Sequence, residues 1–302
     1  SECYRLCDRL TVLRDGAVVA SAPTAELPRA ALIGAMLGRS AESIHSTRPA
    51  RVPRAGVPAL EARGLSWRGR VRDVSYAVRP GEVVGLAGLL GAGRTETMKA
   101  SFGAEAKEAG EVRIGGEAVA TPTPGRSIAA GLAFLSEDRR AEGIFPKLSV
   151  AENLAATALP ALTRFGFISR RRQDAVVARF IAELGIKAAG PGAPITALSG
   201  GNQQKVLLAR CLATAPRAIM LDDPTRGIDV GAKAEVHAAI HRLVENGLGV
   251  LATSSELEEL MALADQLVVL NEGAVTGTLA TEGAGVQDVL DLFATAHEST
   301  AE

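Results

Sequence analysis

The octapeptide Gly88-Leu-Leu-Gly-Ala-Gly-Arg-Thr95 decides the fold of this chain. It follows the apolar run Val83–Ala87, which has the composition of a buried strand, and leads into a helix expected over Arg94–Phe102. Glycines in such a turn let backbone N–H groups point at a phosphate, and a helix start adds positive potential. A plain tight turn is the alternative, which the flanking strand and helix disfavour. The sequence therefore predicts a phosphate-binding loop.

Two side chains at the end of this loop bear on its chemistry. Thr95 is placed to offer its hydroxyl to Mg²⁺. The basic position is Arg94, where such loops normally carry lysine, and a planar guanidinium differs in shape from a compact ammonium on a flexible stem. We therefore expect nucleotide binding here to be weakened or altered.

A second element reads Ala218-Ile-Met-Leu-Asp-Asp-Pro-Thr225. Its four apolar residues predict a buried strand that places Asp222 at its carboxyl end, where α/β sheets bind ligands. Asp222 suits the shell of a Mg²⁺ ion, usually through water, and Asp223 lies where a base could orient an attacking water. The alternative is a strand-end turn with two solvated acids.

Composition narrows the class of protein. The chain has 302 residues, which predicts about two domains, and 47% hydrophobic residues, 22% charged residues and a net charge of −1. These values exclude disorder, collagen and coiled coil as overall classes and argue against a protein that coats nucleic acid. No run reaches about 18 uncharged apolar residues, so no transmembrane helix is predicted. The three cysteines are too few for a disulfide scaffold and fit a reducing compartment.

Buried strands alternate with helices along most of the chain, which predicts a mostly parallel sheet in an α/β domain. Strands over 59–63 and 71–78 come first and predict an antiparallel β-subdomain at the edge of that sheet. The other expected elements are strands at 83–87, 111–114, 218–221 and 250–253 and helices at 94–102, 127–130, 170–184, 202–214 and 231–245.

An internal repeat relates the two ends of the chain. Residues 7–16 and 264–273 each form an apolar strand that ends in an acidic residue and glycine, with Asp8 aligned to Asp265 at an offset of 257. A second strand and a small helix follow each copy, near 25–37 and 286–296. We interpret residues 1–38 as the tail of a first module and 39–58 as a linker. Module 59–296 is then complete, with 297–302 as a tail, and the start at Ser1 suggests a fragment.

A third element, Leu198-Ser-Gly-Gly-Asn-Gln-Gln-Lys205, again presents an anion-facing helix start. One nucleotide needs only one phosphate loop, so a second helix start that can bind a phosphate implies a second nucleotide. This octet resembles the signature motif of ABC ATPases. Residues 59–295 resemble the second nucleotide-binding module of duplicated monosaccharide-importer ATPases of the ribose, galactose and xylose type. The runs at 136–139, 223–232 and 254–256 match that subtype.

The resemblance implies a P-loop NTPase fold of the ABC ATPase type, with a mostly parallel core sheet, an antiparallel β-subdomain and a helical signature subdomain. It implies ATP and Mg²⁺ as cofactors and a peripheral place on the cytoplasmic face of a bacterial inner membrane. The implied partners are a first ABC module or another copy, transmembrane permease subunits and, indirectly, a periplasmic sugar-binding protein. Two such modules pair head to tail, and each ATP lies between the phosphate loop of one and the signature of the other.

The family's functional residues carry over by position. The implied catalytic residues are Asp223, Glu137 and Ser255, and the implied metal ligands are Thr95, Asp222 and Glu137. The implied nucleotide-binding residues are Gly88, Leu89, Leu90, Gly91, Ala92, Gly93, Arg94, Thr95, Trp67, Ser199, Gly200, Gly201, Gln203 and Asp229.

This site departs from the family's pattern at four positions. Besides Arg94, the family usually has glutamine at Glu137, a catalytic glutamate at Asp223 and histidine at Ser255. Asp223 is one methylene shorter than glutamate, and a misplacement of that size can cost ~10²-fold in rate. We expect a slow or structural nucleotide site here, while the intact signature completes the site of a partner module. Asp229 is expected at the seam between the two modules.

For several other residues the sequence leaves a functional and a structural interpretation open. Trp67 could stack on adenine or pack in the core. Arg170–Arg172 could approach anionic lipid or permease acids or form a solvated helix start. Phe145 and Pro146 lie where such ATPases dock a permease helix, and a zinc site at His237 and His241 is disfavoured.

Three function classes follow. The first is the energy-coupling ATPase subunit of an importer, for a monosaccharide or for nucleosides or other small solutes. The second is a nucleotide-binding scaffold half that does not hydrolyse ATP. The third is a soluble ABC ATPase acting on DNA or ribosomes, which the absence of long insertions and strongly basic tracts disfavours.

Overall fold

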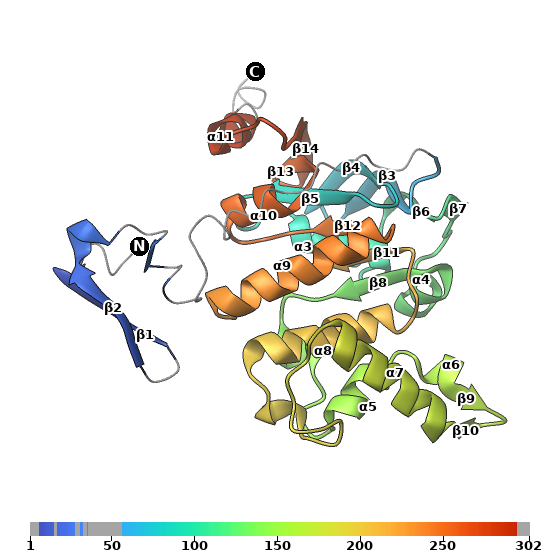
Figure 1. Ribbon diagram of the computed structural model, residues 1–302. Coiled ribbons are helices and arrows are strands. Elements are labelled where there is room, and N and C mark those ends of the chain that lie inside the picture. The colour runs from blue at the N-terminus through green and yellow to red at the C-terminus, as the bar shows by residue number, and fades with distance from the viewer. Residues whose placement is uncertain (1–5, 15–16, 28–30, 33–34, 36–55, 295–302) are drawn as a thin grey trace.

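The computed structural model describes residues 6–14, 17–27, 31–32, 35 and 56–294 (Figure 1). Its centre is a six-stranded sheet in the order β14-β13-β5-β12-β11-β8. Five of these strands are parallel, and β14 pairs antiparallel with β13 at one edge. The strands are β5 (Val83–Gly88), β8 (Leu132–Leu135), β11 (Ala218–Leu221), β12 (Gly249–Ala252), β13 (Gln266–Asn271) and β14 (Ala274–Ala280). The predicted, mostly parallel core sheet is confirmed.

Helices cover one face of this sheet and bury a large apolar core against it. They are α8 (Gly200–Leu212), α9 (Val230–Glu245), α10 (Leu257–Leu263) and α11 (Val286–Ala294). A helical subdomain adds α5 (Val150–Ala155), α6 (Leu159–Leu162), α7 (Arg170–Glu183) and the short hairpin β9 (Thr163–Arg164) and β10 (Phe167–Ile168). Buried residues such as Val177 and Phe180 of α7 join the same core, so the subdomain is packed onto the sheet rather than tethered to it.

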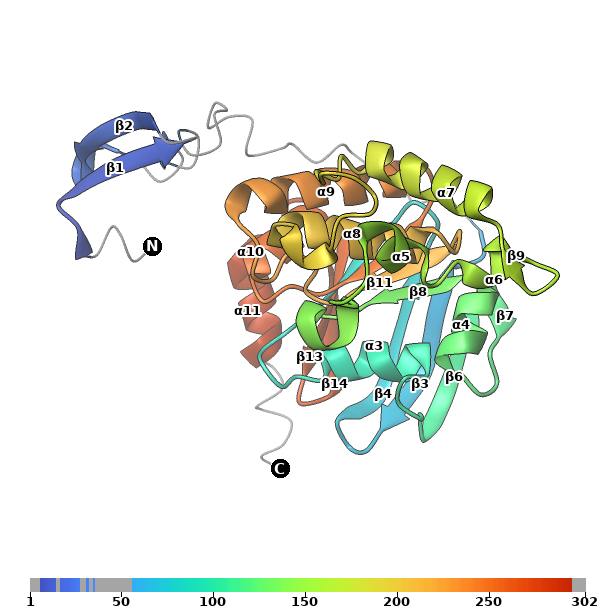
Figure 2. The same cartoon turned by 90° about the horizontal axis from the view of Figure 1, so that it is seen from below.

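The other face is covered by a separate antiparallel sheet in the order β4-β3-β6-β7. Its strands are β3 (Leu60–Trp67), β4 (Val71–Val78), β6 (Ala109–Ile114) and β7 (Glu117–Ala118). Helix α3 (Arg94–Phe102) lies between the two sheets, and α4 (Pro124–Ala130) flanks β8 (Figure 2). One core contains Leu60 and Leu65 of β3, Met98 of α3 and Leu86 of β5. The prediction that the antiparallel β-subdomain lies at the edge of the parallel sheet is therefore wrong. Both sheets have an apolar face, and stacking buries more of it than side-by-side pairing.

The N-terminal hairpin of β1 (Arg9–Arg14) and β2 (Ala17–Pro23) repeats the geometry of β13 and β14. Every residue pair of the second hairpin lies 257 positions after a pair of the first, and the register shift after Val12 recurs after Val269. The Thr24 hydroxyl donates to the Cys7 carbonyl at 2.6 Å, and the Thr281 hydroxyl donates to the Ala264 carbonyl at the same distance. The repeat seen in the sequence therefore extends to the backbone.

The described residues also include the short helical turns η1 (Thr24–Glu26), η3 (Arg139–Gly143) and η4 (Ile195–Ala197). The helix expected at 25–37, the linker at 39–58 and the tail at 297–302 lie largely or wholly outside the described residues. No helix in the described parts of the chain has the length and apolar character needed to cross a bilayer.

Candidate nucleotide-binding site

The predicted phosphate loop connects the buried strand β5 to the start of α3. Gly91 and Gly93 have φ of 83° and 95°, which favours glycine, and a Cβ on Gly93 would lie 2.5 Å from the Arg70 carbonyl oxygen. No side chain caps the first turn of α3. Its free N–H groups can therefore receive an anion.

Two carboxylates stand beside this loop at the carboxyl end of β11. Asp222 is 2% exposed, and its Oδ1 accepts a hydrogen bond of 2.7 Å from the Thr253 hydroxyl. Among the described residues, Asp222 Oδ2 and Asp223 Oδ1 are buried without a hydrogen-bond partner. Since a buried carboxylate oxygen is costly to leave unpaired, these two atoms indicate a position for a cation or a donor.

Asp223 has a backbone φ of 45°, a left-handed conformation that aspartate tolerates better than most residues. Burial raises the pKa of its carboxyl, and hydrogen bonds from the Ser255 side chain and backbone oppose that rise. Burial likewise raises the pKa of Asp222, opposed by the hydroxyls of Thr253 and Thr95. Both carboxyls are thus in settings where an added positive charge would stabilise the ionised form.

A cleft of about 580 Å³ joins the phosphate loop to these acids. Its lining includes the predicted residues Leu90, Gly91, Ala92, Gly93, Arg94, Thr95, Glu137, Asp222, Asp223 and Ser255. Its volume lies in the range of small-ligand sites. Gly88 and Leu89 lead into the loop, Leu89 being largely exposed and Leu90 99% exposed.

Arg94 points to the protein's own backbone. Its Nη1 donates a hydrogen bond of 2.6 Å to the carbonyl oxygen of Ser254, which follows β12. The guanidinium therefore ties the phosphate loop to the loop that carries Ser255. This contact is available to the forked guanidinium and bears directly on the predicted change in nucleotide binding.

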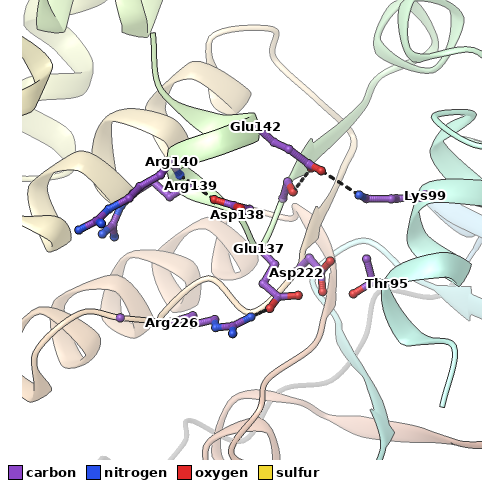
Figure 3. Close-up of a pocket in the computed structure, with 11 residues that line it drawn as sticks. Thr95, Lys99, Glu137, Asp138, Arg139, Arg140, Glu142, Asp222 and Arg226 are labelled. Carbon is purple, nitrogen blue, oxygen red and sulfur yellow. Dashed lines mark hydrogen bonds and ion pairs between the residues drawn. The ribbon is translucent and has the colours of Figure 1, made fainter. Parts of the chain in front are cut away.

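Glu137 lies at the mouth of the cleft, where it forms an ion pair with Arg226 (Figure 3). Asp222 and Thr95 face the same space. On the far side of this segment, Glu142 accepts from the Ser136 hydroxyl and from Lys99 of α3 at 3.0 Å, and these hydrogen bonds lower the pKa of Glu142. The segment around Glu137 is thus held by charges on both sides.

The signature residues lie at the start of α8 and line none of the pockets around the phosphate loop. A Cβ on Gly201 would lie 2.4 Å from Cβ of Ala232, so this glycine allows α8 to approach α9 closely. Arg139 Nη1 donates to the Gly200 carbonyl at 3.1 Å. Ser199 is exposed at the helix start, and its hydroxyl accepts from Asn202 at 2.9 Å.

The remaining predicted residues have local partners. Gln203 donates to the carbonyls of Ile195 and Leu198. The exposed Asp229 caps α9 by accepting from the Ala232 amide at 2.9 Å. Trp67 is 8% exposed in the core between the sheets, with the Arg68 guanidinium 5.4 Å from its ring centroid. That placement fits the packing interpretation, which the sequence left open beside adenine stacking.

A buried carboxylate that sequence analysis missed stands behind the site. The Glu259 side chain is 9% exposed, and His237 Nε2 lies 2.6 Å from it. It accepts from Lys233 at 3.3 Å, from the Ser254 hydroxyl at 3.0 Å and from the Thr225 hydroxyl. Burial alone would raise the pKa of Glu259, but the contacts with His237 and Thr225 and the charge of Lys233 lower it to about 2. Glu259 thereby joins α10 and α9 to the loops that carry Asp223 and Ser255.

A phosphate loop between β5 and α3, acids at the end of β11 in the same parallel sheet, and a glycine-led helix α8 packed beside a helical subdomain define an ABC-type P-loop ATPase fold. Residues 71–226 match the family model described as ABC transporter. The chain belongs to this family.

Comparison with curated proteins gives named relatives. The chain is 42% identical over 289 residues to a ribose import ATP-binding protein of Rubrobacter xylanophilus, covering 96% of this chain and 55% of that protein. It is 37% identical over 291 residues to the ribose import ATP-binding protein of Bacillus subtilis, covering 96% and 58%. The chain thus spans little more than half the length of these relatives.

Solved structures share the fold. An ATP-binding cassette of an ABC transporter matches with a TM-score of 0.68 at 18% identity, covering 79% of this chain and 99% of that one. A dimeric cassette in a post-hydrolysis state, bound to ADP and Pi, matches with a TM-score of 0.62 at 19% identity, covering 74% and 98%.

Proposed function

We propose that this chain binds ATP with Mg²⁺ in the cleft between the Gly88–Thr95 loop and Asp222. The observation that carries the proposal is the pair of unpartnered buried oxygens, Asp222 Oδ2 and Asp223 Oδ1, at a cleft lined by a glycine-rich helix start. The helix start would take the phosphates, and Thr95, Asp222 and Glu137 would hold the metal. Mg²⁺ supplies charge neutralisation for the phosphates when it is bound.

Hydrolysis at this site is proposed to be slow. Asp223 is the acid placed to orient water, but its short side chain and left-handed backbone keep its carboxylate near Ser255. Ser255 offers a hydroxyl and no group that titrates near neutral pH. Arg94 is engaged by the Ser254 carbonyl. These three features support nucleotide binding with weak turnover.

The signature is proposed to complete a second nucleotide site on a partner module. Ser199 and Gly200 stand at an exposed helix start outside this chain's own cleft. The solved cassette bound to ADP and Pi is described as dimeric. The matched hairpins at the two ends of the chain support a preceding first module, of which residues 1–38 are the tail.

At the level of the cell, we propose an energy-coupling ATPase subunit of a monosaccharide importer. The names of the curated relatives support sugar import, and nucleosides or other small solutes are the alternative cargo. Such a subunit would lie on the cytoplasmic face of a bacterial inner membrane, under permease subunits that receive sugar from a periplasmic binding protein.

A groove of about 480 Å³ beside the nucleotide cleft suits the permease contact. Phe102, Phe134 and Leu207 give it apolar walls. Arg210, also in its lining, holds the half-exposed Phe145 ring, with 4.9 Å from guanidinium to ring centroid. An inserted helix end would bury these rings.

The test is binding of a fluorescent ATP analogue with and without Mg²⁺. The Asp222→Asn variant is expected to lose the Mg²⁺-dependent part of the affinity, because it removes the charge beside Thr95. Asp174→Asn, the same change at an exposed position of α7, is the matched control. Equal Mg²⁺ dependence in both variants would exclude Asp222 as a metal ligand, and absence of analogue binding to the unmodified chain would exclude the proposed site.

A further inference from the structure

The hairpin of β9 and β10 exposes an unusual amount of apolar surface at its tip. Phe165 is 87% exposed, Phe167 is 81% exposed and Ile168 is 47% exposed. Figures 1 and 2 both show this hairpin projecting from the helical subdomain, away from the core sheet. Clustered exposed aromatic residues on a soluble domain indicate a surface that meets an apolar phase or partner.

The turn itself places an aromatic residue where the backbone disfavours it. Phe165 and Gly166 occupy the two central positions with φ of 52° and 83°, as in a type I′ turn. Asparagine or glycine normally occupies the first of these positions, and a bulky side chain there is uncommon. A phenylalanine at a strained and exposed position points to a role outside the fold.

The base of the hairpin is fixed. The Ser169 amide donates to the Leu162 carbonyl at 3.0 Å, and the Thr163 hydroxyl donates to the Leu159 carbonyl at 2.7 Å. The aromatic tip is therefore held out by α6 rather than left as a loose loop. A tip that is already ordered loses little conformational entropy when it enters a membrane interface or a partner surface.

Positive charge accompanies the aromatic tip. Residues 163–174 contain four arginines and one aspartate, Asp174. Arg171 and Arg172 are exposed at the start of α7, and neither has an ion-pair partner among the described residues. Hydrogen bonds from the Ser149 side chain and backbone lower the pKa of Glu152, and the positive charge of Arg170 adds to this lowering. A net positive segment at the start of α7 thus follows the hairpin directly in the chain.

We propose that this hairpin is a membrane anchor: Phe165 and Phe167 enter the interface of an anionic bilayer, and Arg171 and Arg172 contact its phosphate groups. Projecting apolar tips backed by basic residues suit a lipid surface, whereas a protein partner of this chain would be met at the concave groove beside Phe145. The anchor goes beyond the proposed nucleotide site and does not depend on it. It would hold the helical subdomain against the bilayer.

The test is co-sedimentation of the chain with vesicles of phosphatidylcholine alone or mixed with phosphatidylglycerol. We expect binding to the mixed vesicles that falls at high salt. Phe165→Asn with Phe167→Thr should reduce it by about tenfold, and asparagine suits the turn, so this variant keeps its fold. Arg171→Gln with Arg172→Gln should reduce it roughly 30-fold. Arg72→Gln with Arg126→Gln removes the same charge from other exposed positions and should have a much smaller effect.

Insertion has its own readout. Tryptophan emission from Phe167→Trp should shift to shorter wavelength and be quenched by brominated lipid, while the buried Trp67 stays constant. Lack of binding to mixed vesicles, or equal binding of the hairpin variants and the control, would overturn the proposal. So would a hairpin variant that binds vesicles normally but fails to associate with a permease, because the partner would then be a protein. If the hairpin variants lose vesicle binding but bind the fluorescent ATP analogue normally, the result supports the membrane anchor independently of the proposed nucleotide site.

Discussion

Replacing Glu259 with glutamine removes the negative charge that joins four elements behind the nucleotide cleft. Glutamine preserves the size of the side chain and one acceptor oxygen, but it cannot balance the charge of the Lys233 ammonium. The pKa of the Glu259 carboxyl falls from 4.5 to about 2 in the fold. A difference of this size corresponds to about 3 kcal/mol of folding free energy.

The sign of the pH dependence follows from the direction of this shift. Because folding lowers the pKa of the carboxyl, its contribution is present above pH 4.5 and is lost as the pH falls toward about 2. At pH 7 we expect Glu259→Gln to unfold with about 3 kcal/mol less free energy than the unmodified chain. This difference in unfolding free energy between the variant and the unmodified chain should become steadily smaller below pH 4.5.

Urea unfolding at a series of pH values measures this gap. Glu258→Gln is the matched control, since it makes the same change at the adjacent, exposed residue. We expect that control to lie within about 0.5 kcal/mol of the unmodified chain. If Glu259→Gln were no less stable than Glu258→Gln at pH 7, or if the gap stayed constant into acid, Glu259 would not be the charged link between these elements.

Two further predictions concern the nucleotide sites. Arg94→Lys should raise the affinity for a fluorescent ATP analogue by about tenfold, because it releases the Ser254 carbonyl and places a compact ammonium at the loop. A fall in affinity would instead show that the guanidinium itself binds phosphate. Ser199→Arg in a full-length protein containing both modules should abolish ATP turnover and leave analogue binding at this chain's own cleft unchanged. Surviving turnover would mean that the signature does not serve a partner site.

Much of the fold follows from local sequence. The strand at Ala218–Leu221 and the helix at Arg94–Phe102 have the predicted bounds. Charged residues, Arg217 and Asp222, border the apolar run of the strand, and left-handed glycines border the helix. The helix expected at 127–130 lies within α4, but strand β8 is absent from the expected elements, although Gly131, with φ of 96°, ends the helix and marks the start of a new element. The stacking of the second sheet on the first depends on contacts between distant segments and has no local signal.

The residues of the candidate site also fall into two groups, those that local sequence predicts and those that it does not. Residues at the ends of strands or the starts of helices, such as Asp222 and Thr95, are predictable because the topology brings those ends together. The Glu259 cluster is assembled from α9, α10 and the turn after β11, and each member looks like an ordinary surface residue in the sequence. The ion pair of Glu137 with Arg226 likewise becomes visible only when its two loops are placed side by side.

Phosphate release from Mg-ATP by the purified chain, measured beside binding of a fluorescent ATP analogue, tests the central claim most directly. The geometry of Arg94, Asp223 and Ser255 predicts saturable analogue binding with little or no phosphate release. Robust turnover would contradict the claim, because it would mean that these three residues form a working variant of the hydrolytic site.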